Sequence, residues 1–397
     1  MKIGGVVAEF NPFHNGHGAV CAAARAGGVT HMVAVMSGNF VQRGDIAVTE
    51  KRVRAACALS SGVDLVFEIP LPWAMATAQT FARGGVGLLA ACGCVDLLVF
   101  GSESGDLPAL RELAEGLDSP ALEARLRELL PTGLTYAKAR ELAARETLGD
   151  ALADRLASPN DLLGVAYLRA ASALGWNPEV LPVGRKGTGH DSATPAGGYA
   201  SASFLRTRPK DFSALAGYIP PDCLALLRQA GEEGLYPADK SKLEPAILAH
   251  LRRLSRDDLA RLPDLSEGLE NRLYGGIRRA GSLSALAMAV KTKRYTLARI
   301  RRLILSGFLE IHREDSQGLP PYLRVIGLND RGAEILARMK KTATLPVDAS
   351  LARLARLDTR CERIAGLEER AGDLYGLALP QVLPCGYERT AKVVVFK

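Results

Sequence analysis

Two histidines three residues apart, His14 and His17, are the residues near the start of this chain whose types and spacing favour chemistry. An apolar run at 6–10 precedes them, and a run of small residues at 18–26 follows. This order predicts a buried strand, a tight turn and a helix whose free N–H groups and dipole favour phosphate. Imidazoles held there can donate hydrogen bonds to a phosphoryl group that gains charge. We interpret the pair as a phosphate site rather than as solvated loop histidines or half of a metal site.

The elements that must position these histidines alternate between apolar strands and helices. The expected strands are residues 6–8, 31–36, 63–69, 95–100 and 179–183. The expected helices between them are residues 18–26, 49–61, 79–92 and 162–174. Such alternation predicts an α/β fold with a parallel sheet covered on both faces and a ligand at the carboxyl ends of the strands. The chain has neither a GxGxxG fingerprint nor a P-loop.

The length of 397 residues predicts at least two domains. We expect a catalytic domain over 1–210, with a helical insertion at about 104–157 that is rich in Leu, Ala, Glu and Arg. Residues 211–397 are expected to form a C-terminal region that is mostly helical to about 310. Its last part, from 320 on, is expected to be mixed, with a late strand at 393–396.

The composition, 48% hydrophobic and 23% charged, is typical of a globular protein with a sizeable core. No apolar run long enough to span a membrane and no signal peptide is found. Seven cysteines without a CxxC pair predict reduced, mostly buried thiols in a cytoplasmic protein. Cys92 and Cys94 are expected to pack rather than to bind a metal. The net charge of +7 admits an anionic partner.

A polar loop at 36–44 follows the second expected strand. Its small residues allow close approach, and Ser37, Gln42 and Arg43 can bind a small anionic substrate. An ordinary polar surface loop is an equal alternative.

Four candidates follow the later strands. Gly101 permits a base or ribose to pack on the backbone, although glycines are also common at strand ends. Asn160 lies just before a helix, where N-capping is the alternative role. Arg185 and Lys186 follow the fifth strand and are candidates for phosphate contact.

A serine-rich helix start carries a further arginine. Ser201 and Ser203 offer hydroxyls, and Arg206 lies three residues beyond Ser203. This arrangement suits the β- and γ-phosphates of a nucleoside triphosphate, but serines near helix starts are common.

Taken together, these blocks resemble the tRNA(Met) cytidine acetate ligase family, a branch of the HIGH-type nucleotidyltransferases. The resemblance rests on separate blocks that occur in order along most of the chain. They are residues 9–17, 36–44, 62–66 with Glu68, 100–103, 158–161, 200–203, 266–272 and 293–296. The sequence departs from the family at Gly18 and Cys21, where relatives carry larger side chains, and after Arg185, where relatives often have a tyrosine before His-Asp.

The resemblance implies a Rossmann-like fold and a two-step reaction. ATP and acetate would form acetyl-adenylate and pyrophosphate, and the acetyl group would pass to the wobble cytidine of elongator tRNA(Met), giving N4-acetylcytidine. It also implies nucleotide contacts from Gly101, Asn160, Arg185 and the segment around the histidines. That segment comprises Val7, Ala8, Glu9, Phe10, Asn11, Pro12, Phe13, His14, Asn15, Gly16, His17, Gly18, Ala19 and Val20.

A mechanism follows for the first step. Acetate attacks the α-phosphorus in line, and His14 and His17 stabilise the charge that develops on the phosphate oxygens. Arg206 and Ser203 would hold the leaving pyrophosphate, with Mg²⁺ bridging the phosphates. The loop of Ser37 and Arg43 would seat acetate or the target cytidine.

Basic residues between 291 and 302 support an RNA partner, the anticodon region of the tRNA. We expect one basic helix on which Lys291, Arg294 and Arg301 line a face, with Tyr295 placed to stack a base. The dense set is Lys291, Lys293, Arg294, Arg299, Arg301 and Arg302. A solvated surface helix paired with acidic neighbours is the alternative.

Two other functions remain open at this point. A small-molecule adenylyltransferase would have the same site, but such enzymes are usually compact and lack a long basic extension. A non-catalytic tRNA-binding protein could retain a nucleotide pocket, which the intact His14, His17, Arg185 and Arg206 argue against.

Overall fold

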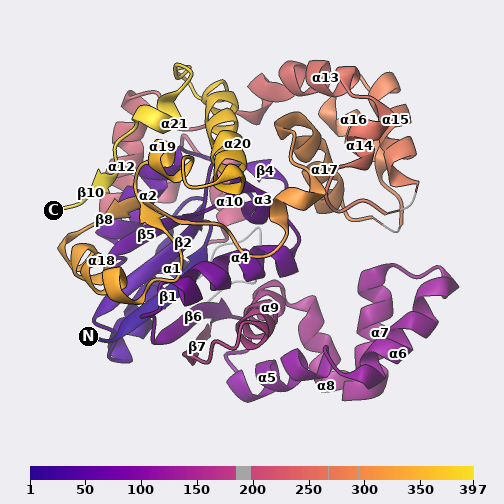
Figure 1. Ribbon diagram of the computed structural model, residues 1–397, viewed down its shortest axis with the longest axis horizontal. Helices are drawn as coiled ribbons and strands as arrows, with labels where there is room; N and C mark the ends of the chain where they lie inside the picture. The colour runs from indigo at the N-terminus through magenta and orange to yellow at the C-terminus, as the bar shows by residue number, and fades with distance from the viewer. Residues whose placement is uncertain (185–197, 267, 294) are drawn as a thin grey trace.

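The computed structural model describes residues 1–184, 198–266, 268–293 and 295–397 (Figure 1). Five neighbouring strands of its main sheet are parallel, in the order β5-β2-β1-β6-β7. They are β1 (Ile3–Ala8), β2 (His31–Ser37), β5 (Leu65–Ile69), β6 (Leu97–Ser102) and β7 (Glu179–Gly184). The strand order reverses at β1, which lies between β2 and β6, and ligands of open α/β sheets bind at such a switch point.

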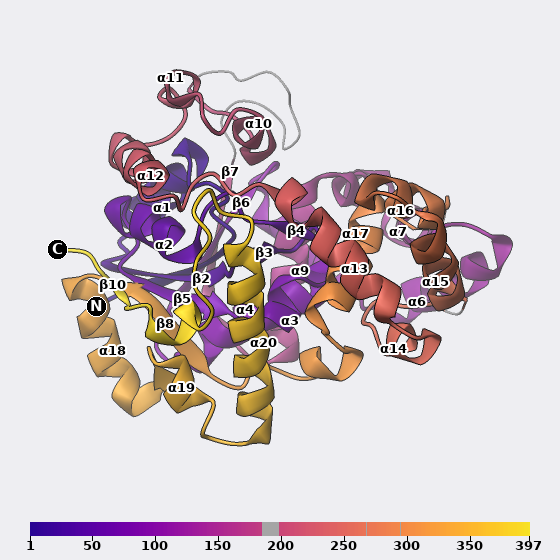
Figure 2. The same cartoon turned by 90° about the horizontal axis from the view of Figure 1, so that it is seen from above.

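Helices cover both faces of this sheet. One face carries α1 (Asn15–Ala26) and α2 (Lys51–Ser60), and α12 (Pro221–Glu232) packs on α2 (Figure 2). The other face carries α4 (Ala78–Ala91) and α9 (Pro159–Ala173), which pack on each other. The parallel sheet predicted from the sequence is therefore confirmed.

The C-terminal part of the chain extends the same sheet. β8 (Leu323–Leu328) pairs antiparallel with β5, so the eight-stranded sheet is mixed. β9 (Val347–Asp348) and β10 (Val394–Val395) pair parallel with β8, and β10 confirms the late strand expected at 393–396. The division at about residue 210 stays a prediction, since strands from both sides of it share one sheet.

Two helical lobes face each other beside the sheet (Figures 1 and 2). The first lies where the sequence predicts a helical insertion. It consists of α5 (Leu107–Gly116), α6 (Pro120–Leu129), η1 (Leu130–Thr132), α7 (Tyr136–Leu148), α8 (Asp150–Asp154) and η2 (Arg155–Ala157). The second, the C-terminal lobe, consists of α13 (Glu244–Arg253), α14 (Arg256–Ala260), α15 (Leu269–Arg279), α16 (Leu283–Val290) and α17 (Leu297–Leu309).

Short elements complete the chain. They are β3 (Phe40–Val41), β4 (Asp45–Ile46), α3 (Leu71–Ala74), α10 (Ala202–Thr207), α11 (Phe212–Leu215), η3 (Lys240–Leu243), η4 (Arg313–Ser316), α18 (Asp330–Thr342), α19 (Leu351–Leu354), α20 (Thr359–Gly376) and α21 (Tyr387–Thr390). All seven cysteines are free and only Cys385 is exposed, which confirms mostly buried thiols. In the described part of the chain, no helix is long and apolar enough to cross a membrane.

A buried cluster of charged side chains ties the C-terminal elements to the sheet. Lys51 Nζ on α2 lies 2.5 Å from Glu68 of β5, 2.7 Å from Glu388 of α21 and 3.7 Å from Glu368 of α20. Arg324 Nη1 of β8 lies 2.8 Å from Glu68 and 2.5 Å from Glu388. All five residues are at most 3% exposed, so each charge depends on the others.

The cluster shifts the pKa values of its carboxyl groups in opposite directions. Burial raises the pKa of Glu388, but the nearby Lys51, Arg324 and Arg52 outweigh burial and hold that pKa below its ordinary value. The pKa of Glu68 is lowered for the same reason, by Lys51 and Arg324 against burial. Burial and the charge of Glu68 raise the pKa of Glu368 well above its ordinary value.

Glu388→Gln is expected to destabilise the protein at pH 7 by about 3–5 kcal/mol, because it leaves buried cations underpaired. A lowered folded-state pKa gives stability above the ordinary value of 4.5 that is lost as the pH falls below it. The difference in the free energy of unfolding between wild type and variant should therefore become smaller as the pH falls. Glu368, whose pKa is raised, stabilises both proteins as the pH falls, and so it does not change the difference between them. Denaturant unfolding between pH 7 and pH 3 measures this difference.

The exposed Glu123, which pairs with Arg127 on α6, supplies the matched control as Glu123→Gln. This variant should unfold like wild type at every pH, because exposed pairs contribute little. A gap between Glu388→Gln and wild type that stays constant with pH would contradict the assigned charge state.

Candidate active site

The loop after β1 brings both histidines to the first turn of α1. His14 is the N-cap residue, and its Nδ1 accepts the N–H of Gly16 at 3.1 Å. His17 Nδ1 accepts the N–H of His14 at 3.3 Å, and the two rings stack with centroids 3.8 Å apart. Because each Nδ1 is an acceptor, the neutral rings carry their proton on Nε2. The helix start therefore holds two imidazole donors of fixed tautomer.

Close packing fixes the two rings. Phe10 and Phe13 lie against His17, with centroids 5.0 and 5.4 Å from its ring. A Cβ on Gly16 would lie 2.9 Å from His14 Cε1, so only glycine leaves the ring in place. Phe10 has φ +47, a left-handed conformation that is uncommon for a non-glycine residue and recurs at functional sites.

Gly101 lies across the switch point from the histidines, at the carboxyl end of β6. A Cβ added there would meet only Val20 of α1, at 4.0 Å. The backbone of Gly101 thus has open space beside it, as the sequence predicts for a contact with a base or ribose.

The loop after β6 and the start of α9 hold each other through carboxylates. Glu103 accepts the Asn160 side-chain amide at 2.7 Å and the N–H of Asp161 at 2.8 Å. Asp161 in turn accepts the N–H of Glu103 at 2.9 Å. The N-cap of α9 is Ser158, so the alternative of Asn160 as N-cap is wrong. Sequence reasoning named neither acid as a site residue, although an acid in a first helical turn is a common capping signal.

Arg206 connects α10 to the histidine loop, which is distant in sequence. Its Nη1 donates to the carbonyl of Asn11 at 2.8 Å and its Nη2 to Ser203 Oγ at 3.3 Å. Ser201 Oγ caps α10 by accepting the N–H of Phe204, so the ordinary role of a serine at a helix start applies to it. The structure thus brings these residues to the predicted site, whereas Arg185 and Lys186 lie outside the described residues.

Arg54 of α2, which sequence reasoning missed, joins the loops after β1 and β2. The buried guanidinium donates to the carbonyls of Glu9 at 2.6 Å, Ser37 at 3.1 Å, Thr49 at 3.2 Å and also Gly38. Burial lowers the pKa of this group. Since its partners are carbonyl oxygens from segments far apart in sequence, no local pattern reveals it.

The predicted substrate loop forms the β3–β4 hairpin beside Glu9. The N–H of Gln42 donates to Glu9 Oε1 at 2.8 Å, and the Gln42 side-chain amide donates to the carbonyl of Ala76 at 3.1 Å. Ser37 is fully buried, whereas Arg43 is exposed. The hairpin also contacts α17, so it lies between the sheet and the C-terminal lobe.

The expected single basic helix is wrong. Lys291 caps the end of α16, and Lys293 lies in the connection before α17. Arg299 donates to the carbonyl of Asp264 at 2.8 Å, and the buried Arg302 binds the Asp264 carboxylate at 2.6 Å. These two arginines hold the lobe together, and Arg294 lies outside the described residues.

Tyr295, expected to stack a base, is already engaged within the lobe. Arg299 lies over its ring at 4.9 Å, and Ser266 donates to its hydroxyl at 3.0 Å. Arg301 is exposed on α17.

These features define a class: a nucleotidyltransferase-type sheet with a histidine pair at its switch point. A family model described as HIGH Nucleotidyl Transferase matches residues 1–388. The crystal structure of Thermotoga maritima TmcAL (apo, form I) covers 100% of both chains with a TM-score of 0.93 and 33% identity. The same protein bound with alpha-thio ATP gives a TM-score of 0.91 at 32% identity.

Curated relatives are similar in sequence over almost the whole chain. A tRNA(Met) cytidine acetate ligase from Caldanaerobacter subterraneus is 36% identical over 95% of this chain and 96% of its own length. One from Acetivibrio thermocellus is 32% identical over 100% of both. The chain therefore belongs to the tRNA(Met) cytidine acetate ligase family of HIGH nucleotidyl transferases, which confirms the resemblance seen in the sequence.

Proposed function

We propose that this protein activates acetate with ATP and acetylates the wobble cytidine in the anticodon of elongator tRNA(Met). The observation that carries the proposal is the pair of Nε2 donors that His14 and His17 hold at the switch point. The names of its relatives, and the alpha-thio ATP in the TmcAL crystal structure, support the choice of substrates. A tRNA substrate favours the cytoplasm as the location.

ATP is proposed to lie across the carboxyl ends of β1 and β6. Its α-phosphate lies at the N-terminus of α1, where the helix dipole and two imidazoles favour negative charge. The base and ribose lie beside Gly101 and Asn160. Since Glu103 occupies the amide N–H of Asn160, Asn160 Oδ1 is the atom that can accept from the nucleotide. Further contacts are proposed from segment 7–20 and from Arg185, Lys186, Ser201 and Ser203.

The first step needs charge stabilisation at phosphorus. An acetate oxygen attacks the α-phosphorus, the bond to the β-phosphate oxygen breaks, and pyrophosphate leaves. His14 and His17 donate to the oxygens that gain charge, each worth about 10²–10³ in rate. Arg206 and Ser203, which hold each other beside Asn11, are placed to receive the pyrophosphate.

Mg²⁺ is proposed to arrive with the nucleotide. Within the described ranges, no group of three or more His, Cys, Asp and Glu residues could hold a metal ion. Glu103 accepts N–H groups at the start of α9, and Asp161 accepts the N–H of Glu103 in the loop after β6. A group of three such residues is not required, because Mg²⁺ in nucleotide sites keeps water and substrate phosphate oxygens as ligands, with at most one or two carboxylates.

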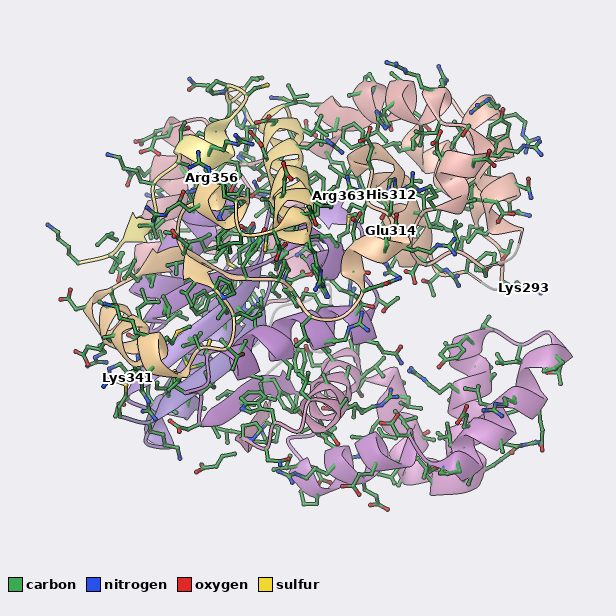
Figure 3. The ribbon with its side chains drawn as sticks, viewed as in Figure 1. Lys293, His312, Glu314, Lys341, Arg356 and Arg363 are labelled. Atoms are coloured by element: carbon green, nitrogen blue, oxygen red, sulfur yellow. The ribbon has the colours of Figure 1, made fainter. Side chains whose placement is uncertain are left out.

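The C-terminal lobe is proposed as the tRNA surface. Residues 244–309 hold thirteen Lys and Arg against six Asp and Glu, an excess of seven that equals the net charge of the whole chain. Among the described residues, the exposed Arg253, Arg279, Lys291, Lys293 and Arg301 have no acidic side chain within 4 Å. Lys293 lies on the side of the lobe that faces α5–α8 (Figure 3). An unpaired anticodon base can be splayed from its loop into the site.

His17→Ala is expected to lower acetate-dependent ATP–pyrophosphate exchange about 10²–10³-fold, because it removes one donor from the α-phosphate. Gly16→Ala should lower exchange too, since the new methyl displaces the His14 ring. Gly366→Ala on α20 is its matched control, because a Cβ there meets nothing within 4 Å. The remote His312→Ala controls for loss of a histidine (Figure 3). Exchange that is absent from wild type, or equal in His17→Ala, would overturn the proposal.

Lys291→Ala/Lys293→Ala should weaken tRNA binding and lower the salt slope of the affinity by about two, because two phosphate contacts are lost. Filter binding from 50 to 200 mM salt measures both quantities. Lys340→Ala/Lys341→Ala removes the same charge from the exposed face of α18, at the far end of the molecule (Figure 3). Equal losses in the two double variants would show a nonspecific charge effect and remove the lobe from the RNA site.

A further inference from the structure

We propose that Glu9 is the general base of the second step, which takes the proton from the cytidine amine as the acetyl group is transferred. This inference rests on the proposed function. The amine nitrogen attacks the acetyl carbonyl carbon, the bond to the phosphate oxygen breaks, and AMP leaves as an anion. The nitrogen then carries one proton too many, and Glu9 accepts it.

The position of Glu9 in the fold supports this role. Glu9 directly follows β1, the strand at the switch point, and precedes the loop that carries His14 and His17. Side chains alternate along a strand, and Val7 belongs to the core on the face of α4 and α9. Glu9 accepts from Gln42, whose side chain binds the carbonyl of Ala76 just before α4 on that face, whereas the histidines lie at the start of α1, on the opposite face.

That side is also where the second substrate arrives. Glu9 Oε1 accepts the N–H of Gln42 at 2.8 Å, so the carboxylate borders the β3–β4 hairpin. The hairpin contacts α17 of the C-terminal lobe, the surface proposed for tRNA. Glu9 thus lies between the adenylating histidines and the RNA surface, where the amine and the mixed anhydride must meet.

Elimination among the carboxylates is the second argument. Glu68 is buried between Lys51 and Arg324. Glu103 is engaged with N–H groups at the start of α9, and Asp161 with N–H groups of the loop after β6. Glu9 is half-buried, and in the described part of the chain its carboxylate has one hydrogen-bond donor, Gln42, and no cation within salt-bridge distance. It can therefore reach both substrate and solvent.

The backbone around Glu9 holds the side chain in place. Arg54 binds the Glu9 carbonyl at 2.6 Å and thereby joins it to the carbonyl of Ser37 on the neighbouring strand. A base that must meet a proton within hydrogen-bond reach needs such a fixed position. The isosteric glutamine keeps an oxygen for the N–H of Gln42, so Glu9→Gln should retain the loop.

The test separates the two steps with Glu9→Gln. Acetate enters as an anion and loses no proton in the first step, so ATP–pyrophosphate exchange should fall far less than acetyl transfer. Single-turnover transfer to tRNA should fall about 10²–10⁴-fold, the usual contribution of a general base. Glu9→Asp should recover part of the transfer rate. Glu112→Gln, on the exposed face of α5, is the matched control and should leave both steps at the wild-type rate.

Equal losses of exchange and transfer would overturn the assignment and place Glu9 in nucleotide binding. Unchanged transfer would overturn it too, because another group would then be the base. Failure of the proposed function itself looks different: wild type would show no acetate-dependent exchange.

Discussion

Helix α2 places three cations, Lys51, Arg52 and Arg54, inside the protein, and the rest of the structure depends on how they are satisfied. Arg54 binds carbonyls from the loops after β1 and β2 and so fixes the edge of the sheet that carries the candidate site. Lys51 and Arg52 bind Glu388, which comes from the end of the chain. One helix therefore connects the candidate site to the C-terminal elements, since a buried charge cannot lose its partner without a large cost.

This connection explains why the sheet contains strands from both ends of the chain. Arg324 of β8 shares Glu68 and Glu388 with Lys51, so β8 must lie beside β5. The C-terminal lobe is then anchored on both sides, through the β3–β4 hairpin and through α20. If the lobe binds tRNA as proposed, this anchoring holds the tRNA at a fixed distance from the histidines.

The sequence predicted the parts of the fold that depend on local patterns. The strands around His14 and His17 are apolar runs with a capping turn between them, and the tautomers of both rings follow from contacts within four residues. Arg54 and the Lys51 cluster could not be predicted, because their partners lie up to hundreds of residues away. β8 was missed because it belongs to a region whose sequence pattern is mixed and does not alternate regularly between strands and helices. The prediction of one basic helix was wrong because the helix is interrupted between α16 and α17, and because Asp264 pairs with Arg302.

The chain belongs to the tRNA(Met) cytidine acetate ligase family, and we propose that the two steps of its reaction use different sides of the sheet. His14 and His17 lie at the start of α1, on one face, while Glu9 and the hairpin lie toward the other. We propose that acetate is activated as an adenylate before its acetyl group is transferred to the tRNA. Acetate labelled with ¹⁸O in both oxygens tests it most directly, by mass spectrometry of the AMP formed with tRNA. With an acetyl-adenylate intermediate, each AMP should contain one ¹⁸O, because an acetate oxygen bonds to the α-phosphorus and stays there. Unlabelled AMP would contradict it.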